Sequence, residues 1–357
     1  MASVVLVTGV SRHLGGRVAV ALSKSPEIER IIGVDVIPPP HDIGRAEFIR
    51  ADIRNPMIGR IIAQAGVDTV VHMNVIATPT MVGGRTSQKE INVIGTMQLL
   101  AACQKASTVT RLVVKSSAAV YGSGPRDPAM FTEDMGPKST PRTGFGKDSL
   151  EVEAYVRGFA RRRPEVEIAV LRFANVLGPS IRTSMTDYFS LPVLPVPMGH
   201  DARMQFVHED DAVESLRLAT LGTAEGIVNI AGPGVITLSQ ATGLAGAVAL
   251  PVPLTLAGPL GGLVKRASGA DFSSDQISFL AYGRGMDTTR MASVLGFVPR
   301  WSTHDTFVDF VRSRGHSVLD TQPVAEALGS LSSLLARSAN NAGLPQDVVA
   351  TADRKGR

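Results

Sequence analysis

The sequence predicts an α/β protein built on a doubly wound parallel sheet, with a smaller domain in the C-terminal half. Two observations lead to this prediction. Short apolar runs alternate with amphipathic segments of helical spacing through the first half of the chain, and a turn with two glycines follows the first run. Strands that alternate with helices form a parallel sheet covered by helices on both faces. Ligands of such sheets bind beyond the carboxyl ends of the strands.

The first unit of this pattern has the layout of a dinucleotide-binding crossover. The apolar run Val4–Val7 predicts a buried strand, and the turn after it contains Gly9 and Gly15. A second apolar run, Ile31–Val34, ends in Asp35, which lies about 20 positions beyond the last glycine of the turn.

Each part of this unit has a physical role in holding a dinucleotide. Gly9 permits a tight turn, and Gly15 lets the helix lie close to the strand. The free N–H groups at the helix N-terminus attract a pyrophosphate. The Asp35 carboxylate accepts hydrogen bonds from ribose hydroxyls and repels a 2′-phosphate, which favours NAD over NADP. The residues assigned to the cofactor in this turn are Gly9, Ser11, Arg12, His13, Leu14 and Gly15.

The middle glycine of such turns is absent here. Arg12 or His13 occupies its position, depending on which of two common spacings applies. A side chain there crowds the pyrophosphate unless it points away, although Arg12 could instead contact a phosphate. An ordinary α/β turn with an ordinary aspartate is the alternative interpretation.

The later elements continue the alternation. Strands are expected at residues 4–8, 30–35, 46–51, 67–74, 111–117 and 166–173. Helices are expected at residues 15–25, 56–65, 85–107 and 143–162. Polar side chains at or just after the predicted strand ends are Asp35, Asp52, His72, Asn74 and Ser117. Because the carboxyl ends of parallel strands meet at one edge of the sheet, we expect these side chains to lie near the ligand.

Length and composition limit the possible functions. The 357 residues suit one large or two small domains. The 36 basic and 32 acidic residues give a net charge of +4, which does not suggest nucleic-acid binding. The single cysteine, Cys103, excludes an internal disulfide and fits a reducing, cytoplasmic setting. The first strand is expected within about three residues of Met1, without the basic and apolar regions of a secretory signal.

One apolar stretch complicates this assignment. Residues 226–264 contain no charged side chain, which invites a transmembrane interpretation. Pro251, Pro253 and Pro259 argue against one continuous spanning helix. We expect a strand at Val252–Leu254 and then a short helix, with peripheral membrane contact or burial against a partner as the alternatives.

The composition also predicts domain boundaries. After the sixth strand, residues 179–199 are rich in Pro, Ser and Thr and carry few charges, which is typical of a loop-rich cap. We expect a dinucleotide-binding domain at 1–178, a domain at 179–315 with a segment near 204–230 that returns to the core, and a tail at 316–357 that is helical or mobile.

Motifs occur in a fixed order along the chain. They are Thr8-Gly9-x5-Gly15, Ala51-Asp52-Ile53-Arg54, Val70-Val71-His72, Ile91-Asn92-x-x-Gly95-Thr96, Ser116-Ser117-Ala118-Ala119-Val120-Tyr121-Gly122, Leu171-Arg172-Phe173-Ala174-Asn175, Phe206-Val207-His208-Glu209-Asp210-Asp211 and Asp287-Thr288-Thr289-Arg290. Across roughly residues 3–313 they resemble the extended short-chain dehydrogenases, in particular the NAD-dependent nucleotide-sugar epimerase/dehydratase family that includes UDP-glucose 4-epimerase. The resemblance implies a Rossmann-type fold, bound NAD, and a nucleotide-sugar-like substrate.

The resemblance also implies catalytic roles. Ser117 falls on the serine or threonine that orients the substrate hydroxyl, and Lys147 falls on the lysine that holds the nicotinamide ribose. The family has a tyrosine four residues before that lysine, where this chain has Thr143. An aliphatic hydroxyl is too weak an acid to replace a phenol in proton transfer. Proton transfer through water or another side chain near Thr143 would give a slow enzyme.

Further site residues follow from the resemblance alone. The additional residues implied at NAD are Asp52, Ile53, His72, Asn74 and Asn92, and those implied at the substrate are Asn175 and Arg203, together with Ser117. We expect His72 to pack under the cofactor, with a role as acid or base as the alternative. No metal site is predicted.

Two functions from different classes fit these observations. The first is an NAD-dependent epimerase or dehydratase that removes and returns a hydride. The second is a catalytically impaired family member that binds NAD as a sensor or as a subunit of a complex. In either case the resemblance implies a homodimer paired through the helices expected at 85–107 and 143–162.

Overall fold

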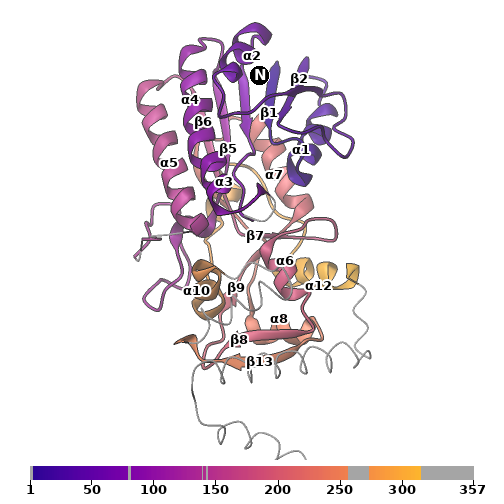
Figure 1. The fold of residues 1–357 in the computed structure, drawn as a ribbon, viewed down its shortest axis with the longest axis vertical. Helices are drawn as coiled ribbons and strands as arrows, with labels where there is room; N and C mark the ends of the chain where they lie inside the picture. The colour runs from indigo at the N-terminus through magenta and orange to yellow at the C-terminus, as the bar shows by residue number, and fades with distance from the viewer. Residues whose placement is uncertain (1–2, 79–81, 139, 142–143, 256–272, 315–357) are drawn as a thin grey trace, which may run out of the picture.

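The computed structural model has a seven-stranded parallel sheet with a group of helices and short strands at one end (Figure 1). It describes residues 3–78, 82–138, 140–141, 144–255 and 273–314. The strands in spatial order are β11 (Gly226–Ile230), β6 (Glu167–Phe173), β5 (Arg111–Ser117), β4 (Thr69–His72), β1 (Val4–Thr8), β2 (Arg30–Asp35) and β3 (Glu47–Arg50). All neighbouring pairs are parallel. The strand order reverses between β1 and β4, which confirms the doubly wound sheet.

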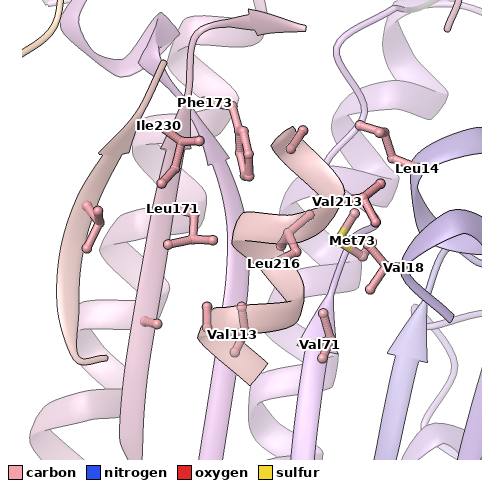
Figure 2. Packing of buried hydrophobic residues seen from close by; sticks show 14 of the residues in the cluster. Leu14, Val18, Val71, Met73, Val113, Leu171, Phe173, Val213, Leu216 and Ile230 are labelled. Atoms are coloured by element: carbon pink, nitrogen blue, oxygen red, sulfur yellow. The ribbon is translucent and has the colours of Figure 1, made fainter. Parts of the chain in front are cut away.

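Helices cover both faces of this sheet. One face carries α1 (His13–Ser23) and α7 (Glu209–Leu221), and the other carries α2 (Met57–Ala65), α4 (Thr96–Lys105) and α5 (Gly144–Arg162). Because successive strand residues point to opposite faces, Val5 and Val7 pack toward α1 and α7 while Leu6 packs toward α2 and α4. Figure 2 shows the first of these layers, with Val113 of β5 and Leu216 of α7 in the same cluster.

The helix expected at 85–107 is divided into three segments. They are α3 (Arg85–Lys89), a π-helical segment η2 (Glu90–Gly95) and α4. Gly95 ends the π-helical segment beside Ile53, where an added Cβ would lie 2.7 Å from the Ile53 Cδ1 atom. Hydrophobic spacing alone does not distinguish this wider turn from a regular helix.

The group at the end of the sheet contains three two-stranded sheets. They pair β10 (Phe206–His208) with β7 (Asn175–Leu177), β12 (Ile236–Thr237) with β9 (Arg203–Met204), and β13 (Val248–Val252) with β8 (Val193–Pro197). The helices around them are α6 (Ser184–Phe189), α8 (Leu238–Leu244), α10 (Ser274–Tyr282) and α12 (Thr303–Ser313), whereas α11 (Thr289–Ser293) packs against β11 of the large sheet. Three aromatic rings, those of Phe189, Phe206 and Phe307, contact one another in the core of this group.

The apolar stretch is described only in part. The strand expected at Val252–Leu254 is β13 (Val248–Val252), which begins and ends earlier than expected and pairs with β8. Residues 256–272, which include the expected short helix, lie outside the described residues, as does the tail from 315 onward. Across the described ranges, none of the helices has both the length and the apolar character that crossing a membrane requires.

A buried ion pair fixes the carboxyl end of the sheet. Arg172 of β6 donates to Glu153 of α5 through Nη2 (2.7 Å) and Nε (3.0 Å), and both residues are buried. Arg172 also donates to the phenol oxygen of Tyr121 (2.8 Å), which in turn donates to Asn229 of β11 (2.8 Å). Burial raises the pKa of the Tyr121 phenol. This network joins the turn after β5, which contains Tyr121, to β6, β11 and α5 beside the strand ends.

Candidate functional site

Gly9 in the turn after β1 and Gly15 at the start of α1 let the helix begin close to the end of the strand. Gly9 has a φ of 77°, which favours glycine, and its N–H donates to the Val34 carbonyl (2.8 Å). An added Cβ at Gly15 would lie 2.1 Å from the Gly9 carbonyl oxygen, which is impossible for real atoms. Both glycines are therefore required for α1 to start close to the end of β1, with its N–H groups facing the strand ends.

Asp35 closes β2 next to this turn. Its carboxylate is buried and accepts hydrogen bonds from the backbone N–H groups of Ser11 (3.1 Å) and Val36 (2.8 Å). The Ser11 hydroxyl donates to the Ile37 carbonyl, so its side chain stabilises the loop. A carboxylate has about four acceptor positions, and about two remain for the hydroxyls of a ribose.

Two buried polar atoms beside the turn have no hydrogen-bond partner in the described structure. They are Nε of Arg12 and Oδ1 of Asn74. Burial lowers the pKa of Arg12, and the charge of Asp35 opposes that shift. Leaving such groups unpaired costs about 1–3 kcal/mol each, so a polar partner for them would be stabilising. The cradle made by Gly9 and Gly15, with a cation beside it, fits the pyrophosphate of a dinucleotide.

The imidazole of His72 is neutral, and both of its nitrogens form hydrogen bonds. Its Nε2 lies 2.8 Å from the Thr96 hydroxyl, which donates its proton to the Asn92 carbonyl and therefore accepts from His72. Nδ1 lies 3.0 Å from the Thr8 hydroxyl and accepts from it. Burial, with a smaller contribution from the charge of Lys115, lowers the pKa of His72 to about 3. The imidazole thus joins β1, β4 and α4, and neither nitrogen is available for proton transfer.

Asn92 holds the loop that follows β4. Its Oδ1 accepts from the Ile76 N–H (2.8 Å) and its Nδ2 donates to the Ile76 carbonyl (2.9 Å). Asp52 forms an ion pair with Arg54 (2.7 Å), and hydrogen bonding to that guanidinium lowers the pKa of the carboxyl. Ile53 is buried. The structure therefore gives Asn92 and Ile53 a supporting position, and their contact with NAD stays a prediction.

A cavity of about 810 Å³ opens beyond the strand ends. Its volume lies within the range of roughly 300–1,000 Å³ that small-molecule sites occupy. The sequence-predicted site residues that line it are Arg12, His13, Leu14, Gly15, Ser117 and Asn175. Ser117 ends β5, and its hydroxyl oxygen accepts the N–H of Ala119 (3.1 Å), which leaves its proton free to donate. These residues come from three separate parts of the chain and share one cavity wall.

Lys147 and Arg203 are not among the described residues that line this cavity. Lys147 is 45% exposed and lies 3.8 Å from Glu151, its neighbour one helical turn away. Arg203 is exposed at the start of β9. Thr143 lies outside the described residues. The roles predicted for Lys147, Arg203 and Thr143 stay predictions.

Several charged residues in the cavity wall were not found from the sequence. They are Lys115 of β5, Arg85 of α3, Arg182, Asp275 of α10 and Arg284. Only Lys115 carries a local signal, because it directly follows the apolar run Leu112–Val114 in a central strand, where a charged residue is unusual. The others come from distant segments that only the fold brings together.

Arg85 and Arg284 have structural partners. Arg85 donates to both carboxylate oxygens of the buried Asp148 and to the Gly144 carbonyl (2.8 Å), which ties α3 to the start of α5. Arg284 donates to the Gly122 carbonyl (2.7 Å) and to the Ser123 hydroxyl (3.0 Å). Both guanidinium groups therefore fix cavity walls in addition to supplying charge.

These features together define a dinucleotide-binding α/β protein with an adjoining cavity. The chain belongs to the NAD-dependent epimerase/dehydratase family, whose model matches residues 5–231. An uncharacterized protein of Mycobacterium tuberculosis is 46% identical over 316 residues, covering 87% of this chain and 84% of that protein.

Solved structures share the fold. UDP-glucose 4-epimerase of Thermotoga maritima, in complex with UDP-glucose, has a TM-score of 0.67 at 21% identity, covering 87% of this chain and 98% of that one. UDP-glucuronic acid 4-epimerase of Bacillus cereus, in complex with NAD, has a TM-score of 0.63 at 19% identity, with the same coverage. At these identities the likeness concerns the fold.

Proposed function

We propose that this chain binds NAD and acts on a nucleotide sugar through transient hydride transfer, leading to epimerisation or dehydration. The observation that carries the proposal is that the glycine turn and Ser117 face one cavity at the switch point of the sheet, beside the strand end closed by Asp35. Family membership and the NAD and UDP-sugar complexes of the structural relatives support it.

The turn and the neighbouring strand end would hold the cofactor. The N–H groups at the start of α1 and the guanidinium of Arg12 would bind the pyrophosphate, and Asp35 would bind the adenosine ribose. Asn74, with its unpaired oxygen, would accept a hydrogen bond from the cofactor. NAD, when bound, supplies the hydride acceptor.

Ser117 and Asn175 would face the substrate. The free proton of the Ser117 hydroxyl can donate to the reacting oxygen of the sugar and orient it. Asn175 begins β7 on the wall formed by the C-terminal group, and its amide can donate to a diphosphate. A nucleoside diphosphate sugar, such as a UDP- or dTDP-sugar, is the substrate class we propose.

The test uses the purified full-length protein. Bound nucleotide is released by denaturation and identified by absorbance and chromatography, and the protein is then mixed with UDP- and dTDP-sugars while NADH absorbance is followed. Bound or bindable NAD and its reduction by at least one sugar are expected. A protein that binds no NAD contradicts the proposal entirely.

A second function is favoured by one specific observation. The family tyrosine is replaced by Thr143, which removes the usual proton-transfer group. A chain that binds NAD without using it would act as a sensor or as a subunit of a complex. Tight NAD binding without reduction by any nucleotide sugar would support this second function over the first.

A further inference from the structure

The cavity lacks a phenol in the described structure. The chain has four tyrosines, all in described segments, and none lines the cavity. Tyr121 and Tyr188 are buried with hydrogen-bonded phenols, Tyr155 is exposed on α5, and Tyr282 lies edge-on to His200. An enzyme of this reaction type must exchange a proton with the sugar hydroxyl. Another side chain in the wall would have to do so.

Lys115 lies where such a group is needed. It precedes Ser117 by two residues on β5, so both side chains point to the same face of the sheet, and both line the cavity. Its ammonium donates to the Val75 carbonyl (3.1 Å), and none of the described carboxylates forms an ion pair with it. A cation in a central strand without an acidic partner is costly, which points to a functional reason for its presence.

The surroundings of Lys115 destabilise its charged form relative to a lysine in water. Burial, with a smaller contribution from the positive charge of Arg12, lowers its pKa to about 8. Arg12 itself faces Asp35, and the nearby His72 is neutral. An amine that titrates close to physiological pH can both accept and return a proton.

The wall contains two other candidates for proton transfer, His13 and Asp275, and both contact groups outside β5. His13 lies 2.9 Å from Glu209 through Nε2, which orients its ring toward α7. Asp275 accepts the N–H of Gly146 (3.3 Å) at the start of α5, and burial raises its pKa. Neither lies on β5, where Lys115 shares a strand face with Ser117.

We propose that Lys115 exchanges the proton with the substrate hydroxyl, in place of the phenol that position 143 lacks. This inference rests on the proposed function. Bound NAD would accept the hydride from the sugar carbon, and the hydroxyl proton would pass to the lone pair of Nζ, so that an amine would become an ammonium and the alcohol a carbonyl. On the return step the ammonium gives the proton back to the oxygen as the carbon regains the hydride.

The first test compares variants in single-turnover reduction of bound NAD. Lys115→Arg keeps the charge but cannot act as a base, and Lys115→Met removes the group. We expect both to slow reduction by roughly 10²- to 10⁴-fold. Lys24→Met, at an exposed lysine after α1, is the matched control and should keep the wild-type rate. Lys115→Ala should regain activity when small primary amines are added, which a variant that merely misfolds would not do.

The second test follows pH. The wild-type reduction rate should rise with pH and level off above about 8, as Lys115 loses its proton. Lys115→Arg should lack this rise of the rate with pH. NMR of ¹³C-methylated lysines should show Lys115 titrating at the same pH in the absence of substrate.

The outcomes separate the two proposals. If the wild type binds NAD but no sugar reduces it, the proposed function fails and this inference falls with it. If the wild type is active and Lys115→Met keeps its rate and the rise of that rate with pH, only the inference is overturned. If the rise of the reduction rate with pH is lost in Asp275→Asn but kept in Lys115→Arg, the proton transfer belongs to Asp275, and the inference is again overturned.

Discussion

The carboxylate of Asp35 gives the sharpest test of cofactor choice. Its two oxygens already accept the N–H groups of Ser11 and Val36, and about two acceptor positions remain for ribose hydroxyls. Asp35→Asn keeps the size of the side chain but removes the charge and turns one oxygen into a donor. We therefore expect weaker NAD binding, together with a smaller preference against NADP because nothing then repels the 2′-phosphate.

The size of the effect follows from the bonds that are lost. Hydrogen bonds to a charged group contribute about 1.5–3 kcal/mol, and part of this is offset by the remaining oxygen, which leaves a loss of roughly 1–3 kcal/mol. This corresponds to a roughly 5- to 150-fold rise in Kd for NAD. The new NH₂ also faces a backbone N–H, so the free protein should lose about 1 kcal/mol of stability.

Calorimetric titration with NAD and NADP measures both effects, and urea unfolding measures the stability. Asp134→Asn, which removes an exposed carboxylate outside the cavity wall, serves as the matched control and should bind NAD like the wild type. Wild-type binding of NADP as tight as that of NAD would refute the reasoning. So would an Asp35→Asn variant with unchanged NAD affinity.

Four further predictions concern the scaffold. Gly15→Ala should lower Tm and abolish NAD binding, because the added Cβ would lie 2.1 Å from the carbonyl oxygen of Gly9. This clash outweighs the helix preference of alanine, which is about 1 kcal/mol. An unchanged Tm in calorimetry would contradict this prediction. Glu153→Gln leaves Arg172 buried without its charge partner and should cost roughly 3–5 kcal/mol in urea unfolding, whereas a loss under about 1 kcal/mol would count against the ion pair. The pKa of His72 is about 3 in the folded protein and about 6.5 in the unfolded chain, so between these values only the unfolded chain binds the extra proton. The free energy of unfolding should therefore fall as pH decreases from about 6.5, by up to about 1.4 kcal/mol per pH unit from this site. Urea unfolding at several pH values should show a weaker dependence of stability on pH for His72→Gln. Finally, Met97 is 36% exposed on α4, and if the expected homodimer forms through this face, light scattering should show a dimer for the wild type and a monomer for Met97→Asp.

The sheet could be predicted because its signals are local. Apolar runs such as Ile31–Val34 mark strands wherever both faces are covered, and an acidic residue at the end of a run marks a strand end. Parallel pairing then follows from the alternation with helices, without knowledge of any contact. The position of Asp35 beside the glycine turn is therefore visible in the sequence.

The cavity wall could not be predicted in the same way. Asp275 and Arg284 reach it from the C-terminal group, at sequence separations for which no local pattern exists. For Lys147 the family resemblance implies a place at the cofactor, which stays a prediction; in the structure its ammonium lies 3.8 Å from Glu151. Lys115 lies between these cases. Its charge follows the apolar run Leu112–Val114 of a central strand, but only the structure shows that it faces the cavity and that none of the described carboxylates pairs with it.

The scattered origin of the cavity wall bears on how the protein is made. A ribosome releases the glycine turn and the central strands well before α10, which contributes Asp275, and before Arg284. A nascent chain that stops short of α10 therefore has every residue proposed to hold NAD, but lacks one side of the substrate compartment. The residues proposed to hold NAD are therefore synthesised before those that complete the substrate compartment.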